Sequence, residues 1–364
     1  MTTAGTTFLP DFLLPAHGLC LLNHDILVEL LSSGEEHDIF STGVEFRDER
    51  ERKLLEESAD IFEWFERTGR TADRNDVLRR TVFPAVLSDF LHFIFEALET
   101  SRKAKLTTTY ALLRKPLQDN LFLLETIATD VDRFGAQLAE NPLKLEARTA
   151  GDRRAHTQRI ATALQALGEE DRLEPDFLAE VRYDKSSEDS FAGSSNMALH
   201  LFTDHAAIRT EPLNVNFIFS DWEAKKTQWY YLYARLPYLL FYARRLVEHM
   251  CATFARTDRV YLADIERRVA AATILWAPNI EQSYRHPAID RFIQATRRRL
   301  DEECRAAGYR KPEKSDLPRM RDSGAYPGEP RIETQLRNGR YAVAALARRI
   351  GRAIRDRPHN RRGR

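Results

Sequence analysis

The spacing of apolar residues along the chain predicts a helical protein. Between residues 75 and 98, apolar side chains recur at steps of three and four positions, which places them on one face of an α-helix. The members of this face are Val82, Val86, Leu87, Phe90, Leu91, Ile94 and Leu98. Similar spacing predicts further helices over residues 46–69, 106–130, 153–167, 175–183, 221–255, 260–276 and 287–307. We therefore expect an all-α protein.

Only two short stretches alternate apolar and polar residues as a β-strand does. They are AAIRT, residues 206–210, and NVNFIF, residues 214–219. Glu211 and Pro212 lie between them and are residues that form turns. We expect a small β-hairpin near residues 206–219, inserted between helices.

Composition divides the chain into four parts. Residues 139–152 contain proline and glycine without a sustained apolar period, so they mark a boundary between two predicted helical bundles, at 1–140 and 141–307. Residues 308–334 contain four prolines and three glycines, which is typical of a linker. Residues 335–364 remain, and they predict a basic amphipathic helix and tail.

Charge is distributed unevenly along a chain whose formal net charge is zero. Residues 1–66 hold fifteen Asp and Glu against four basic residues, about −11, whereas residues 335–364 hold ten Arg against one Asp, about +9. In the basic part the apolar residues at helical spacing are Val343, Leu346, Ile350 and Ile354. On the flanks and opposite side lie Arg348, Arg349, Arg352 and Arg355. Such a helix suits nucleic-acid phosphates, an anionic membrane or an acidic protein surface, of this chain or another. The apolar stripe lacks Trp and Phe, which argues against the membrane.

A stripe of tyrosines and arginines runs along the predicted helix over residues 221–255. Its members are Tyr231, Arg235, Tyr238, Tyr242, Arg245 and His249. The steps of three and four place these residues on one side of the helix. If that side is exposed, the rings can stack on bases and the guanidinium groups can bind phosphates. The alternative is that the tyrosines lie at a core boundary and the arginines pair with carboxylates of a neighbouring helix.

The stretch from Ser194 to Asp221 gathers several side chains that can carry chemistry. The candidates are His200, Asp204, His205 and Arg209. His200 and Asp204 share a face if this stretch is helical, an arrangement that orients an imidazole or ligates a metal. A histidine and an arginine together also suit acid–base or phosphate chemistry. The simplest interpretation is a polar turn in which Asp204 caps a helix end.

The run RRLVEH, Arg244 to His249, resembles the R-x4-6-H motif of HEPN-type helical ribonucleases. That resemblance covers six residues and implies metal-independent RNA cleavage by Arg244 or Arg245 with His249. Arg352 and His359 show the same kind of spacing, and two occurrences are no more than chance gives in a chain so rich in arginine. Ribonuclease activity is therefore an alternative hypothesis, and whether the chain is an enzyme stays open.

Other features narrow the class of protein. Nucleotide-binding, hydrolase and zinc-protease motifs are absent from the sequence, which predicts neither a cofactor nor a metal. The three cysteines, at positions 20, 251 and 304, are far apart, and no run of about 18 apolar residues suggests a membrane span. We expect a cytoplasmic protein that associates with nucleic acid, RNA or single strands, through its basic end and the Tyr/Arg stripe. The alternative is a non-catalytic interaction protein that pairs its acidic and basic regions, as a homo-oligomer or with an acidic partner.

Overall fold

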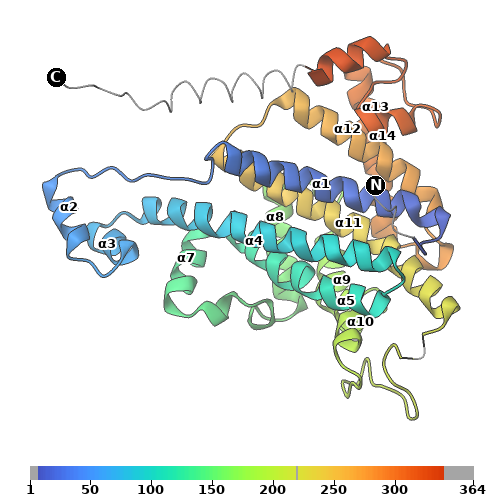
Figure 1. Ribbon diagram of the computed structural model, residues 1–364, viewed down its shortest axis with the longest axis horizontal. Coiled ribbons are helices and arrows are strands. Elements are labelled where there is room, and N and C mark those ends of the chain that lie inside the picture. The colour runs from blue at the N-terminus through green and yellow to red at the C-terminus, as the bar shows by residue number, and fades with distance from the viewer. Residues whose placement is uncertain (1–6, 219, 340–364) are drawn as a thin grey trace, which may run out of the picture. The chain divides into compact units, whose positions relative to one another are not determined.

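The computed structural model describes residues 7–218 and 220–339 (Figure 1). All regular elements in these ranges are helices and none is a strand, which confirms the all-α prediction. The longer α-helices are α1 (Leu14–Glu36), α4 (Thr71–Arg102), α8 (Arg153–Leu167), α11 (Trp222–Phe254), α12 (Arg259–Trp276) and α13 (Pro287–Ala306). The shorter ones are α2 (Glu49–Glu56), α3 (Ile61–Thr68), α5 (Leu106–Lys115), α6 (Leu121–Thr129), α7 (Val131–Glu140), α9 (Pro175–Tyr183), α10 (Phe191–Leu199) and α14 (Leu317–Ser323). A π-helical turn, η2 (Pro116–Asn120), joins α5 to α6, and short 3-10 turns complete the fold.

Local sequence signals set several helix ends. The side chain of Asp60 accepts hydrogen bonds from two backbone N–H groups of the first turn of α3, and that of Asp221 accepts one from Ala224 at the start of α11. Gly69 ends α3 with a left-handed φ of 67°, a conformation that glycine adopts without strain. The predicted end of this helix at Gly69 is therefore confirmed.

The chain divides into two compact units, which differ from the predicted bundles. Unit 1 contains residues 1–256 and 276–296, and unit 2 contains residues 257–275 and 297–364. Residues 1–140 do not form a core of their own, because α11 packs against α1, α5, α6 and α8. Helix α11, residues 222–254, contacts helices from both predicted bundles, so the two bundles share one core.

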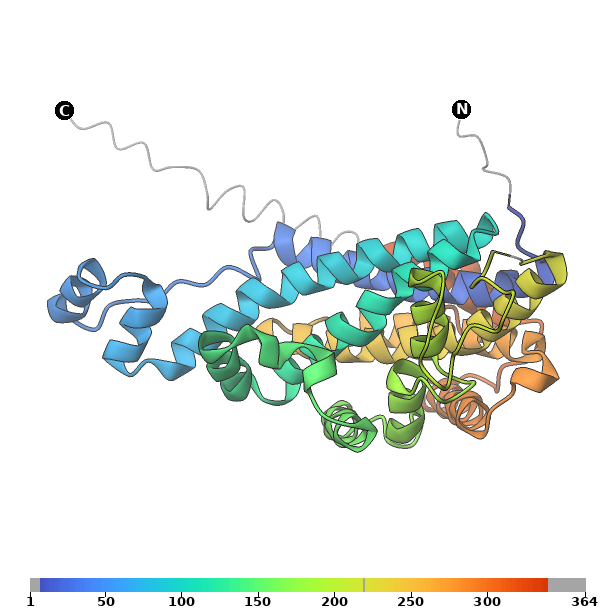
Figure 2. The same cartoon turned by 90° about the horizontal axis from the view of Figure 1, so that it is seen from below.

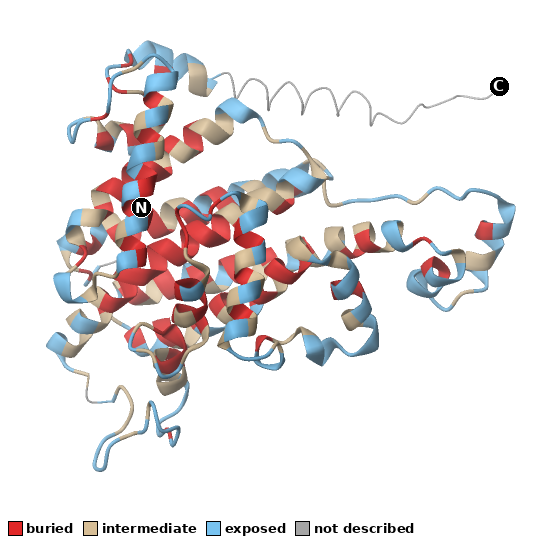
Figure 3. Cartoon of the chain, turned by 180° about the vertical axis from the view of Figure 1, so that it is seen from behind, coloured by how far each residue is buried: buried red, intermediate tan, exposed pale blue. Residues whose placement is uncertain are grey.

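Four helical segments form the core of unit 1. Figures 1 and 2 show α1, α4 and α11 side by side, and Figure 3 shows buried residues concentrated along them. The Tyr233 hydroxyl of α11 bonds to His17 of α1 (2.8 Å) and to Ser101 of α4 (3.0 Å). From the third side, the Tyr110 hydroxyl of α5 donates to the Gln228 carbonyl at 2.7 Å. The core is thus apolar in bulk and held in register by a few buried hydrogen bonds.

The predicted β-hairpin is wrong. Residues 206–218 form turns, and their polar side chains take the hydrogen bonds that a strand partner would provide. Thr210 N donates to Thr203 O at 2.9 Å, and the Thr210 hydroxyl donates to Asn216 Oδ1 at 2.9 Å. Positive φ angles at Leu213 and Phe217 break the extended backbone that the alternating pattern suggested.

One helix in the described part of the chain, α4, is long and apolar enough to span a membrane, with a window of mean hydropathy 1.4. A core helix passes the same test of length and composition. Leu87 and Ile94 of α4 are buried inside unit 1. Asp89, on the same helix, pairs with Lys115 at 2.7 Å. One helix that passes a test of length and composition is weak evidence for a membrane span.

The segment predicted as a linker is a packed part of unit 2. Leu317 and Met320 of α14 are buried in a cluster with Ile274 of α12 and Leu300 of α13. Tyr326 stacks on Tyr309 with ring centroids 4.4 Å apart. The prolines and glycines of residues 308–334 therefore form turns that bring apolar side chains together, whereas the prediction took them as signs of an extended spacer.

The predicted basic helix lies mostly outside the described residues. Residues 331–339 are helical. Within them, Arg337 donates to Asp264 at 3.2 Å and pairs with Glu329. Residues 340–364, which contain Arg348, Arg349, Arg352 and Arg355, are not described.

Candidate functional site

The Tyr/Arg stripe of α11 lies in the core of unit 1. The exposed fractions are 8% for Tyr231, 2% for Arg235, 1% for Tyr238 and 0% for Tyr242. A buried ring cannot stack on a base, so the predicted nucleic-acid face has to be corrected for these four residues. The periodicity identified one side of the helix correctly, and that side faces other helices.

Aromatic neighbours enclose the stripe along its length. Tyr231 packs against Tyr110 and Phe191, with ring centroids 6.2 and 5.2 Å away. Tyr238 packs against Phe177 and Phe292, with centroids 5.5 and 5.4 Å away. These partners lie 40 to 121 residues away in the sequence, which is why the pattern of α11 alone does not show them.

The arginines of the stripe are paired with carboxylates. Arg235 bonds to Asp189 and to the Tyr284 carbonyl. Arg245 donates from Nε to Glu169 at 2.6 Å and is 28% exposed at its side chain. The alternative predicted pairing with carboxylates of a neighbouring helix. The pairing is observed, but Glu169 lies just after α8 and Asp189 just before α10, outside both helices.

Of the two ribonuclease-like pairs, Arg244 with His249 is not brought together, whereas Arg245 lies close enough to His249 for its charge to act on the imidazole. Arg244 is 1% exposed, donates from Nε to Asn23 at 3.1 Å and pairs with Glu248. Five helical positions separate Arg244 from His249, which turns the two side chains about 140° apart around α11. Burial, followed by the charge of Arg245, lowers the pKa of His249. Arg244 and His249 therefore face different surroundings.

The four candidates between α10 and α11 are exposed and lie on irregular backbone. Helix α10 ends at Leu199 and His200 is extended, so His200 and Asp204 do not share a helical face. His205 Nδ1 lies 3.3 Å from the Ala207 N–H, a local turn contact. Arg209 is exposed on the same loop. Within the described ranges, no group of three or more His, Cys, Asp or Glu side chains can hold a metal ion.

Sequence reasoning missed a buried ionic network centred on Glu125 of α6. Glu125 and Arg182 are both 0% exposed and form an ion pair. Glu125 also accepts from Arg159 Nε at 2.9 Å and from the Tyr242 hydroxyl at 2.8 Å. Burial alone raises the pKa of the Glu125 carboxyl, but the charges of Arg182 and Arg159 outweigh it and hold the pKa below its usual range. The carboxylate is therefore ionised and its acceptor sites are used inside the protein.

The same network satisfies the backbone of the π-helical turn. Pro116 has no N–H, so the helix cannot keep its regular bonding there. Arg182 Nε donates to the Leu117 carbonyl at 2.6 Å, and the Tyr183 hydroxyl donates to the Gln118 carbonyl at 3.2 Å. His156 stacks on Tyr183 at 3.8 Å, and burial together with Arg159 and Arg182 lowers its pKa to about 4. These contacts tie α6, α8 and α9 to the π-helical turn.

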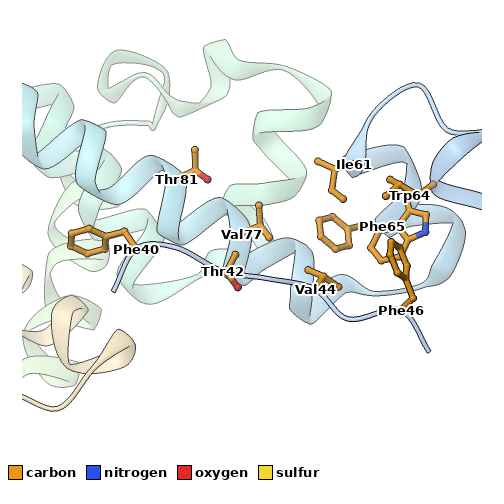
Figure 4. A pocket seen from close by; sticks show the side chains of 10 residues that line it. Phe40, Thr42, Val44, Phe46, Ile61, Trp64, Phe65, Val77 and Thr81 are labelled. Atoms are coloured by element: carbon orange, nitrogen blue, oxygen red, sulfur yellow. The ribbon is translucent and has the colours of Figure 1, made fainter. Parts of the chain in front are cut away.

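A groove lined mainly by apolar side chains lies between α2, α3, α4 and the segment that leads from α1 to α2 (Figure 4). Its volume is about 340 Å³. The residues that line it are Phe40, Thr42, Val44, Phe46, Leu55, Ile61, Trp64, Phe65, Val77 and Thr81. Trp64 is fully buried and donates from Nε1 to the Glu51 carbonyl at 2.8 Å, so the floor of the groove is fixed.

The rim of the groove is apolar and exposed, whereas its surroundings are acidic. The exposed fractions are 43% for Phe46, 36% for Ile61 and 40% for the neighbouring Phe62. Residues 35–81, which carry the groove, hold fourteen Asp and Glu against nine Arg and Lys, about −5. Neighbouring large apolar side chains that stay accessible on a charged surface are typical of interaction sites.

Comparison of the chain with protein-family models, with curated proteins and with solved structures found no match. The groove is therefore interpreted from its own residues.

Proposed function

We propose that this protein is a non-catalytic interaction protein that self-associates by pairing its acidic N-terminal region with its basic C-terminal region. The observation that carries this proposal is the apolar groove of unit 1, which combines an exposed rim with an acidic surrounding. Arg235 and Arg244 supply no comparable open surface, because both are buried in ion pairs.

The charge layout supports association between copies. Residues 1–66 carry about −11 and residues 335–364 about +9, so each copy offers one acidic and one basic region. Two copies can satisfy both regions of each other, which closes a symmetric dimer and leaves no further site free. Charge attraction also sets the register of such an interface and accelerates encounter.

The test is the mass in solution as a function of concentration and salt, on full-length protein freed of nucleic acid. At about 50 mM salt the mass should rise with concentration from 42.1 kDa towards twice that value. At about 500 mM salt, where screening is strong, the rise should be much smaller. A mass that stays at that of one chain at every concentration would exclude self-association.

Association with nucleic acid through the basic end is a second candidate, favoured by the ten arginines between residues 335 and 364. If about six of them contact phosphates, the binding constant should fall with salt at a log–log slope of about −5. Replacing Arg348, Arg349, Arg352 and Arg355 with glutamine should make this slope shallower by about 3 to 4. Equal slopes for both proteins would remove these arginines from any phosphate contact.

A further inference from the structure

We propose that the groove lined by Phe46, Ile61 and Trp64 binds the aliphatic face of residues 340–364 of a second copy of this chain. This inference rests on the proposed self-association and names its contact. It assigns an occupant to an apolar surface in unit 1 that the fold builds and leaves accessible.

The pattern of the C-terminal segment fits the shape of the groove. Val343, Leu346, Ile350 and Ile354 recur at steps of three, four and four, which is the anchor spacing of a helix that lies in an apolar groove. A groove of about 340 Å³ accepts side chains from one face of such a helix and is too small for a folded domain. Branched aliphatic side chains pack well against the aromatic rings that line the groove.

Charge distinguishes this occupant from the other ligands that a basic segment attracts. Acidic side chains dominate the region around the groove, about −5 over residues 35–81, so the groove repels phosphates and anionic membranes. Among them, Glu45, Glu49 and Glu63 are exposed. The arginines that flank the aliphatic face in residues 340–364 bring the complementary charge. The occupant that fits is thus basic on its flanks and aliphatic on one face.

The exposed rim gives the contact its driving force. Phe46 packs edge to face on the buried Trp64, with ring centroids 5.8 Å apart, and remains 43% exposed. Covering Phe46 and Ile61 removes apolar surface from water, which favours binding. The Trp64 ring already holds the Phe46 ring in place before a partner binds. Little ordering of the groove side is needed, because Trp64 and Phe65 are buried before a partner binds.

Site-specific photo-crosslinking tests the contact on the full-length chain. Phe46→p-benzoylphenylalanine places the reactive ring at the rim, and Phe95→p-benzoylphenylalanine is the matched control, because both phenylalanines are 43% exposed. Phe95 lies on α4, 14 positions beyond Thr81 of the groove and about 21 Å further along that helix. Illumination of the Phe46 protein should give a covalent dimer whose cross-linked peptide maps within residues 340–364. The Phe95 protein should give at least tenfold less of this product.

A second pair of variants checks the aliphatic face. Leu346→Asp, introduced into the Phe46-labelled protein, places a charge on that face and should reduce the cross-linked dimer at least tenfold. Ala345→Asp adds the same charge on the other side of the predicted helix and should reduce it less than twofold. Both substitutions lie in residues 340–364, outside the described core, and helical circular dichroism should be unchanged.

The outcomes separate this contact from self-association in general. If the mass rises with concentration but Phe46 cross-links elsewhere or not at all, the groove contact is wrong and self-association stands. A link between residue 46 and residues 340–364 within a single chain would overturn the assignment to a second copy. If the mass stays that of one chain and no link forms, both proposals fail.

Discussion

Replacing Glu125 with glutamine should be among the most damaging single changes in unit 1. The glutamine keeps the size of the side chain but removes its charge and turns one acceptor oxygen into an N–H donor. In the native protein that carboxylate accepts from Arg182, Arg159 and Tyr242. After the change, Arg182 keeps its positive charge at a position with no exposure to solvent.

The expected loss of stability follows from the arginine charges that Glu125→Gln leaves unpaired. Breaking a buried ion pair from one side costs about 3 to 5 kcal/mol, because the remaining charge cannot regain its hydration. Arg182 falls in this range, since both partners are 0% exposed. Arg159 adds less, because 14% of its side chain is exposed and water can replace part of the lost contact. We therefore expect the free energy of unfolding of unit 1 to fall by about 4 kcal/mol, a large share of the 5 to 15 kcal/mol that is usual for a domain.

Tryptophan fluorescence during urea unfolding measures this loss selectively. All four tryptophans, at positions 64, 222, 229 and 276, lie in unit 1, so their signal follows that unit. The midpoint should shift with the slope unchanged, and the shift multiplied by the slope gives the free energy. As a matched control, Glu140→Gln breaks the exposed pair with Lys144 and should cost less than about 0.5 kcal/mol.

A double-mutant cycle tests the cause. Arg182→Met removes the charge but also the donor to the Leu117 carbonyl, so it should be destabilising on its own. Glu125→Met combined with Arg182→Met leaves no unpaired charge, and its cost should be about 3 kcal/mol less than the sum of the single changes. A loss below about 1 kcal/mol for Glu125→Gln, or additive costs in the cycle, would refute this account of the network.

Three further predictions concern other parts of the structure. Burial lowers the pKa values of His17 and His156 from 6.5 to about 4. As the pH falls, these histidines are therefore protonated at a higher pH in the unfolded chain than in the folded protein. Stability should therefore be complete above pH 6.5 and fall towards pH 4, by up to about 1.4 kcal/mol per unit for each histidine, as measured by the urea midpoint of the tryptophan signal. Gly324→Ala should destabilise unit 2 by more than about 2 kcal/mol, because φ is 64° and the new Cβ meets the Asp264 carboxylate. Gly328→Ala is the control and should cost about 1 kcal/mol, because φ is 76° but the space around the new Cβ is open. Amide hydrogen exchange of α12 measures both losses. Arg235→Gln should lower the tryptophan-monitored stability by about 1 to 2 kcal/mol, because the Asp189 carboxylate left behind is 27% exposed and regains part of its hydration. A change below about 0.5 kcal/mol would show that the pairing is not stabilising.

The sequence was informative about helices because their signals are local. The N-cap at Asp221 and the left-handed end at Gly69 depend on a few neighbouring residues, and both lie where the pattern placed them or within a few positions. The predicted hairpin was wrong because a strand depends on contacts that are not local. Alternation over residues 214–219 is a local feature, whereas a strand needs a partner, and Thr203, Thr210 and Asn216 provide the hydrogen bonds instead.

The environment of the Tyr/Arg stripe could not be read from α11 alone. Helical spacing shows which side chains share a side, and it does not show what packs on that side. Arginine is normally exposed, so a stripe with Arg235 suggested a solvent face. Its partner Asp189 lies 46 residues earlier, and the partner of Tyr242, Glu125, lies 117 residues earlier. Only the packing of α6 and the segment before α10 on α11 brings these groups together.

Pro116, inside the predicted helix over residues 106–130, is a local feature that lies next to the buried network. A proline inside a predicted helix removes an N–H and leaves carbonyl groups without their usual donors. In the π-helical turn that starts at Pro116, the Leu117 carbonyl accepts from Arg182 and the Gln118 carbonyl accepts from Tyr183, both of α9. A buried guanidinium requires a carboxylate close to it. Glu125, the fifth residue of α6, supplies this group. Proline alone does not lead to such a pair, because Pro237 also lies inside a core helix and the Tyr233 carbonyl four residues before it accepts from Trp276 Nε1 at 3.0 Å.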